Sequence, residues 1–178
     1  MSAVQQILEA IAALPEAERS DLLSRLRELY GAASPGKQLT LGLAEWEGRA
    51  DCRVVFDGGS QGNPGAGYGS YALFDHGNRG EVTRASFPGA LTNNEAEYLI
   101  LLEALRALLA RLGAQAGATT VEVRGDSSLV IEQVRGKWKA KDERMRALRD
   151  EARGLLSQFK AVRLVQQPRA DTLRVLGH

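Results

Sequence analysis

Residues 52–74 read CRVVFDGGSQGNPGAGYGSYALF, and their pattern predicts two strands joined through a run of glycines. Its first six residues form a mostly apolar run that ends on an acid, Asp57, as is typical of a buried strand. The glycines of residues 58–67 predict a flexible turn, and residues 68–74 predict a second strand. A carboxylate at the end of a strand and before such a turn has no evident packing purpose, which makes Asp57 a candidate functional residue.

The rest of this region alternates between strands and helices. Residues 81–87 predict a strand that pairs with residues 68–74 through a polar turn at 75–80. Apolar spacing and β-branched runs predict the further elements at 94–112, 119–124, 127–135, 141–159, 161–165 and 170–177. The order βββαβααβα predicts an α/β fold, a five-stranded mixed sheet flanked by helices.

The overall composition is that of an ordinary globular domain. Of the 178 residues, 44% are hydrophobic and 25% are charged, which excludes a disordered or collagen-like chain. No apolar run approaches the roughly 18–20 residues of a membrane-spanning helix. The first residues carry acids and lack the basic start and cleavage box of a signal peptide, and Cys52 is the single cysteine. We therefore expect a cytoplasmic protein with no membrane partner.

The first fifty residues predict a separate helical element. Apolar residues at helical spacing predict two short helices within residues 1–33, and a breaker cluster with Pro35 and Gly36 opens a linker at 34–50. The sheet-containing domain is then expected at 51–178. Because two short helices bury little surface alone, we expect this hairpin to pack on the core, on a second copy or on a partner.

Three acids stand where elements of the sheet domain begin or end. Asp57 and Asp126 end predicted strands, and Glu97 lies in the first turns of the helix at 94–112. Side chains at such positions converge at one edge of a sheet, and crowded carboxylates repel one another unless cations lie among them. Hard oxygen ligands suit Mg²⁺ or Mn²⁺. The alternative is that these acids only cap helices, as Glu95 and Glu97 favour the positive end of a helix dipole.

Three sequence blocks together resemble the ribonuclease H type 1 family. They are DGGSQGNPGAG at 57–67, TNNEAE at 92–97 and GDSSLV at 125–130, and the resemblance covers about residues 52–169. It implies a ribonuclease H-like fold and an endonuclease, a hydrolase that cuts the RNA strand of an RNA–DNA hybrid with two Mg²⁺ or Mn²⁺ ions. By their positions in these blocks, the resemblance implies that the metal ligands and catalytic residues are Asp57, Glu97 and Asp126. No protein nucleophile is required.

The residues expected to bind substrate divide into polar and basic groups. Asn63, Asn93 and Asn94 can donate and accept hydrogen bonds, which suits 2′-hydroxyl groups, although turn and cap chemistry is the alternative. By resemblance only, Thr92 contacts a phosphate of the DNA strand. Residues 135–153 hold eight Lys or Arg against four Asp or Glu, which is either a solvated helix face or a phosphate-binding surface.

Within that run, we call residues 135–141 the basic segment; it resembles the family's shorter form, without a longer basic protrusion. Lys137 and Lys139 are expected to contact backbone phosphates, together with Trp138. The alternative for Trp138 is a core aromatic that anchors the loop.

The C-terminal residues depart from the family pattern, which places a fourth acid after the last strand. Aligning on Ala-Asp makes Asp171 that ligand, but the residues that separate Arg from Ala-Asp in the family pattern are then missing. Aligning on Pro168-Arg169 places it at Leu176, two residues before His178. We predict that His178 completes the catalytic and metal-binding set and shifts the preference toward Mn²⁺, because imidazole suits softer ions. The alternative is Asp171, which otherwise only favours its helix dipole.

Two other functions fit the same fold. One is a hybrid- or RNA-binding module with weakened catalysis, which only the C-terminal departure favours. The other is a resolvase or DNA nuclease, which would not require the three asparagines.

Overall fold

The computed structural model describes Pro15, Glu18 and residues 49–177. The expected hairpin at 1–33 and linker at 34–50 fall almost entirely outside these residues, as does His178, so the predictions made for them stay predictions. Among the described helices, none combines the length and the apolar character needed to cross a membrane.

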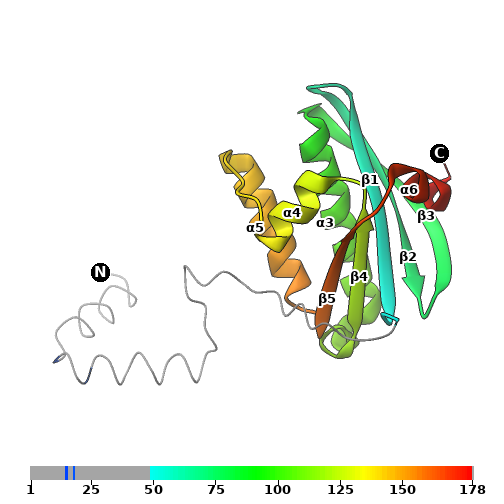
Figure 1. Ribbon diagram of the computed structural model, residues 1–178, viewed down its shortest axis with the longest axis vertical. Coiled ribbons are helices and arrows are strands. Elements are labelled where there is room, and N and C mark those ends of the chain that lie inside the picture. The colour runs from blue at the N-terminus through cyan, green and yellow to red at the C-terminus, as the bar shows by residue number, and fades with distance from the viewer. Residues whose placement is uncertain (1–14, 16–17, 19–48, 178) are drawn as a thin grey trace. The chain divides into compact units, whose positions relative to one another are not determined.

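A five-stranded mixed sheet forms the centre of the domain (Figure 1). Its spatial order is β3-β2-β1-β4-β5; β1, β2 and β3 pair antiparallel, and β4 pairs parallel with both β1 and β5. The mixed sheet predicted from the sequence is therefore confirmed. The strands are β1 (Cys52–Gly62), β2 (Gly65–Asp75), β3 (Asn78–Leu91), β4 (Thr120–Gly125) and β5 (Ala161–Gln166).

The helices cover both faces of the sheet. Figure 1 shows α3, α4 and α5 on one side of the sheet and α6 on the other. The larger core lies under α3 and includes Phe56 of β1 and Leu101 of α3, whereas Val55, Ala72 and Leu176 form a small second core under α6. The helices are α3 (Asn93–Leu112), α4 (Ser128–Arg135), α5 (Glu143–Leu156) and α6 (Arg169–Leu176), with a short 3-10 helix, η1 (Gly113–Ala118), after α3.

The glycine-rich stretch at 58–67 is not the flexible turn that the sequence predicts. β1 continues to Gly62 and β2 starts at Gly65, so the strands form a long hairpin. A Cβ atom on Gly58 would lie 2.8 Å from the carbonyl oxygen of Ala96, and one on Gly69 would lie 2.7 Å from Ile100 Cβ. These glycines therefore let α3 approach the sheet closely. Asp57 consequently lies within β1 and not at its end.

The helix starts are set by side-chain caps. Thr92, Ser127 and Asp142 each accept a hydrogen bond from a backbone N–H in the first turn of α3, α4 and α5. The helix predicted at 141–159 is shorter than expected, because Asp142 caps it at one end and it stops at Leu156.

Candidate active site

The three acids singled out by the sequence lie where β4 ends beside the middle of β1. In the parallel pair of β1 and β4, Val55 is opposite Arg124, so Asp57 and Asp126 lie side by side two residues further on. Glu97 lies where α3 packs against the sheet, because its backbone N and Cα would be 2.8 Å from a Cβ atom on Gly58, the residue after Asp57. The Asp57 side chain is buried, with 8% of the residue exposed, whereas Asp126 and Glu97 are partly buried.

Crowding of these carboxylates changes the acidity of Glu97. Its pKa is raised from 4.5 to about 7, first by burial and then by the negative charges of Asp126 and Asp57. A hydrogen bond from Ser127 Oγ to Glu97 Oε2, 2.5 Å long, and the positive charge of Arg169 oppose this increase. Near neutral pH, a cation among these groups would relieve both the burial cost and the repulsion.

Arg169 supplies a positive charge in this structure. Its Nη1 atom lies 3.1 Å from Asp126 Oδ2 and 3.9 Å from Asp57 Oδ1. Within residues 49–177, no three His, Cys, Asp or Glu side chains are gathered closely enough to hold one ion as they stand. The three carboxylates still have the chemistry of a site for a hard divalent cation, provided that such an ion displaces Arg169 from them.

Glu95 has a purely structural role, which separates it from Glu97. Its Oε2 accepts hydrogen bonds from Thr92 N, at 2.8 Å, and Thr92 Oγ1, at 2.9 Å, while Thr92 Oγ1 accepts one from Glu95 N. This reciprocal arrangement is a capping box. Glu95 Oε1 also lies 3.0 Å from Nη1 of Arg144, which belongs to α5. The cap interpretation therefore holds for Glu95.

Two of the three asparagines fasten the tip of the β1–β2 hairpin to the start of α3. Asn93 Oδ1 accepts hydrogen bonds from Ser60 N and Ser60 Oγ, both at 2.9 Å, and Asn63 Oδ1 accepts one from Asn93 N at 3.2 Å. Each of these two residues thus uses its side-chain oxygen for turn and cap contacts, which was the alternative to substrate binding. The NH₂ group of each carboxamide is bonded to the same carbon as this oxygen and takes no part in these contacts.

Trp138 is not a core residue. It is 50% exposed, so the interpretation as a buried anchor is wrong. The chain turns at Gly136, which has a φ of 84°, and the N–H groups of Lys137 and Trp138 donate to Glu132 O at 2.9 Å and 3.1 Å. The turn therefore projects the basic segment from the end of α4.

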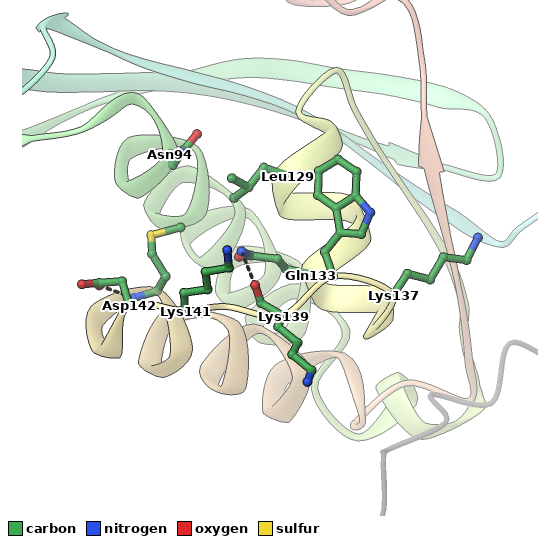
Figure 2. Close-up of a pocket in the computed structure, with 9 residues that line it drawn as sticks. Asn94, Leu129, Gln133, Lys137, Lys139, Lys141 and Asp142 are labelled. Carbon is green, nitrogen blue, oxygen red and sulfur yellow. Dashed lines mark hydrogen bonds between the residues drawn. The ribbon is translucent and has the colours of Figure 1, made fainter.

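The exposed tryptophan lines a pocket of about 580 Å³ (Figure 2). Figure 2 shows Asn94 and Leu129 at one end of it and the lysines of the basic segment at the other. Gln133 Nε2 donates to Lys139 O at 3.4 Å across the pocket wall. Its lining residues are Asn94, Leu129, Gln133, Lys137, Trp138, Lys139, Lys141, Asp142 and Met145.

A second pocket, of about 360 Å³, adjoins the first. Both are lined by Asn94, Asp142 and Met145, and the second also contains Asn63 and Thr92. Apart from Asn93, the residues predicted to bind substrate thus line two neighbouring pockets on the side of α3. The sequence analysis did not single out Arg169 or Ser127 as neighbours of the acids. Their signal was present, since Ser127 follows Asp126 directly and Arg169 follows the last strand.

The candidates for a fourth ligand lie in different surroundings at the C-terminal end of the chain. Leu176, which aligns with the family's acid, is fully buried against Val55 and Ala72. Asp171 Oδ1 accepts a hydrogen bond from Arg174 Nη2 within α6. His178 lies outside the described residues, so its role stays a prediction.

Known proteins were compared with this chain and this structure. The family model described as "Reverse transcriptase-like" matches residues 55–172. A ribonuclease HI from Halobacterium salinarum is 39% identical over 122 residues, which span 68% of this chain and 58% of that protein. A bifunctional protein from Mycobacterium tuberculosis is 41% identical over 121 residues, which span 66% of this chain and 31% of that protein. The match thus spans less than two thirds of either relative.

Solved structures share the fold described above. The crystal structure of RNase H1 from Halobacterium salinarum superimposes with a TM-score of 0.62 at 36% identity, over 69% of this chain and 89% of that one. LC11-RNase H1 in complex with an RNA/DNA hybrid gives a TM-score of 0.63 at 30% identity, over the same shares of the two chains. With the sheet order and these matches in agreement, the chain belongs to the ribonuclease H type 1 family.

Proposed function

We propose that this chain is an endonuclease that hydrolyses the RNA strand of RNA–DNA hybrids by a two-metal-ion mechanism, with Mg²⁺ or Mn²⁺ as cofactor. The observation that carries the proposal is the convergence of Asp57, Glu97 and Asp126, with the pKa of Glu97 raised to about 7 by burial and by the other two charges. The likeness to LC11-RNase H1, whose structure contains an RNA/DNA hybrid, supports the choice of substrate.

The three carboxylates would hold the ions. When bound, two divalent ions supply Lewis acidity for an in-line displacement at phosphorus. Ser127 orients Glu97 through its hydrogen bond to Oε2, so the carboxylate stays turned toward the site. Arg169 would leave Asp126 and Asp57 to the cations, and from the start of α6 it would offer a positive group able to contact a phosphate.

The two pockets beside α3 would bind the substrate. The NH₂ groups of Asn63 and Asn93 can donate to 2′-hydroxyl groups while their oxygens hold the hairpin to α3. The exposed ring of Trp138 offers a stacking surface, and Lys137 and Lys139 offer charge for backbone phosphates. Such contacts distinguish RNA from DNA by its sugar and carry no sequence preference.

A hybrid-binding module with weakened catalysis is the second candidate. The buried Leu176 favours it, because the position that aligns with the family's fourth acid supplies no ligand. The two candidates differ in turnover and share hybrid binding.

The test is cleavage of end-labelled RNA–DNA hybrid, duplex DNA and duplex RNA by the full chain in Mg²⁺, Mn²⁺ or EDTA. We expect the RNA strand of the hybrid to be cut in the presence of either metal and not in EDTA, with both duplexes left intact. Asp126→Asn is the matched inactive control. Hybrid binding without cleavage in either metal would favour the binding module, and cleavage of duplex DNA would contradict both candidates.

A further inference from the structure

A basic pocket lies on the face of the sheet that carries α6. It has a volume of about 350 Å³ and is lined by arginines from three elements, Arg53 of β1, Arg124 of β4 and Arg174 of α6, together with Gln167 and Asp171. Figure 1 shows α6 on the side of the sheet opposite α3, so this pocket lies apart from the two pockets beside α3.

A buried carboxylate holds two of these arginines in place. Glu122 of β4 is only 2% exposed, and its Oε1 accepts from Arg53 Nε at 3.0 Å and from Arg124 Nε at 2.6 Å. Its Oε2 accepts from Arg163 Nε, of β5, at 2.8 Å. Burial by itself would raise the pKa of Glu122, but the hydrogen bonds and charges of Arg124 and Arg163 hold it below the usual value. Glu122 is therefore an anion.

One carboxylate does not balance three guanidinium groups. With Arg174 and its partner Asp171, the cluster holds four arginines and two acids, which leaves an excess of two positive charges. Arg53 and Arg124 both donate to Glu122 through Nε, so the Nη ends of both forks extend beyond the carboxylate. Arg174 is the most exposed of the four, with a side chain 76% exposed.

The cluster of arginines around Glu122 resembles an anion-binding site more closely than a structural ion pair. A carboxylate needs one well-placed arginine for compensation, whereas this one orders three. Arginine forks match the oxygens of phosphate in a bidentate manner, and forks held by a neighbour lose little entropy on binding. We propose that the pocket formed by Arg53, Arg124 and Arg174 binds a phosphate group. Its source is either the backbone of a nucleic acid that extends past the cleavage site or a small free phosphate.

The first test measures phosphate binding at this pocket in the full chain, without divalent metal. Inorganic phosphate is titrated into ¹⁵N-labelled protein, and the Nε–H resonances of Arg53 and Arg124 are followed by NMR, with sodium chloride as the ionic-strength control. We expect saturable shifts with phosphate only. In Arg174→Gln, which leaves the Glu122 cluster intact, the half-saturating concentration should rise about fivefold or more, as for one lost charge-assisted contact.

Controls separate the pocket from general charge effects. Arg106→Gln removes an equally charged, half-exposed side chain of α3 that pairs with Glu151 of α5, and it should leave the titration unchanged. Arg124→Gln should abolish saturable phosphate binding. Because Arg124 also contacts Glu122, the folding of this variant is checked by circular dichroism. If the variant is unstable, the result for Arg174→Gln decides the test. Shifts that are linear, or equal in phosphate and chloride, would overturn the proposal.

The second test distinguishes the two sources. Binding of a hybrid to the metal-free protein is measured against salt concentration for wild type and Arg174→Gln. If the pocket takes a backbone phosphate, the slope of log Kd against log salt should fall by about 0.7–0.9 in the variant. An unchanged slope, with phosphate saturation still weakened, assigns the pocket to a small free phosphate. These measurements do not depend on cleavage, so failure of the proposed catalytic function would leave them interpretable.

Discussion

Arg169 and Asp126 form an ion pair across the edge of the sheet, with Arg169 Nη1 3.1 Å from Asp126 Oδ2. The same guanidinium nitrogen lies 3.9 Å from Asp57 Oδ1. One arginine at the start of α6 thus neutralises part of the charge of two carboxylates. The site is therefore a balance between a cation of the protein and any cation that binds from solution.

This balance predicts how Arg169→Gln changes stability. In EDTA, the variant should unfold at a lower temperature, by the equivalent of about 0.5–1 kcal/mol, because Asp57 and Asp126 repel one another without their shared partner. With saturating Mg²⁺ the difference should vanish, since the ion supplies the charge. Thermal unfolding in both conditions measures this, with Arg106→Gln as the control. An equal loss in both conditions would mean that the arginine acts only by packing.

Removal of any one site carboxylate should abolish catalysis and preserve the fold. Asp57→Asn, Glu97→Gln and Asp126→Asn should each lower kcat by more than about 100-fold, the scale of losing one preorganised group at a reacting centre. Their circular dichroism spectra should match wild type, and relief of repulsion should keep stability equal or higher. The matched control is Glu95→Gln, which keeps a capping residue at the same helix end and should stay active. Near-wild-type turnover in any site variant would remove that residue from the set.

The raised pKa of Glu97 predicts a pH-dependent stability for the metal-free protein. The folded-state pKa is about 7 and the ordinary value is 4.5, so between these pH values the folded state keeps a proton that the unfolded state loses. This contribution is complete below about pH 4.5 and is lost as pH rises through 7, roughly 3 kcal/mol in total. In urea unfolding from pH 4.5 to 8, the stability of Glu97→Gln relative to wild type should therefore increase as pH rises. Parallel profiles would contradict the assigned pKa.

The basic segment should contribute binding energy without affecting the chemical step. Changing Lys137, Lys139 and Lys141 to Ala should raise KM more than it lowers kcat, and the salt dependence of hybrid binding should flatten by about 0.7–0.9 for each lost phosphate contact. A control with the same loss of charge changes Arg106, Arg111 and Lys160 to Gln. An unchanged salt slope in the lysine variant would place these side chains away from the substrate.

The fourth ligand is tested at the two C-terminal candidates. We expect Asp171→Asn to cost little, because its carboxylate pairs with Arg174. His178→Ala should lower activity about tenfold or more, or about 1.4 kcal/mol, and wild type should be more active in Mn²⁺ than in Mg²⁺. The reverse result, an inactive Asp171→Asn and an active His178→Ala, would assign the role to Asp171.

Local patterns in the sequence were sufficient to predict the order of the elements and to select the three candidate acids. Strand and helix periodicity follow from which side chains face the core, and cap residues such as Thr92 and Ser127 act within three residues of their own position. The three motif blocks held Asp57, Glu97 and Asp126, so these candidates needed no knowledge of contacts.

Contacts between distant segments decided the rest. The glycines at 58–67 suggest a loop when considered locally, but the approach of α3 to β1 makes them part of a hairpin and moves Asp57 into a strand. The pairing of Arg169 with Asp126 spans 43 residues. The three arginines around Glu122 come from three strands that meet only in the sheet. The charge and burial of these side chains depend on which segments lie side by side in space. The local periodicity of a sequence does not specify those neighbours.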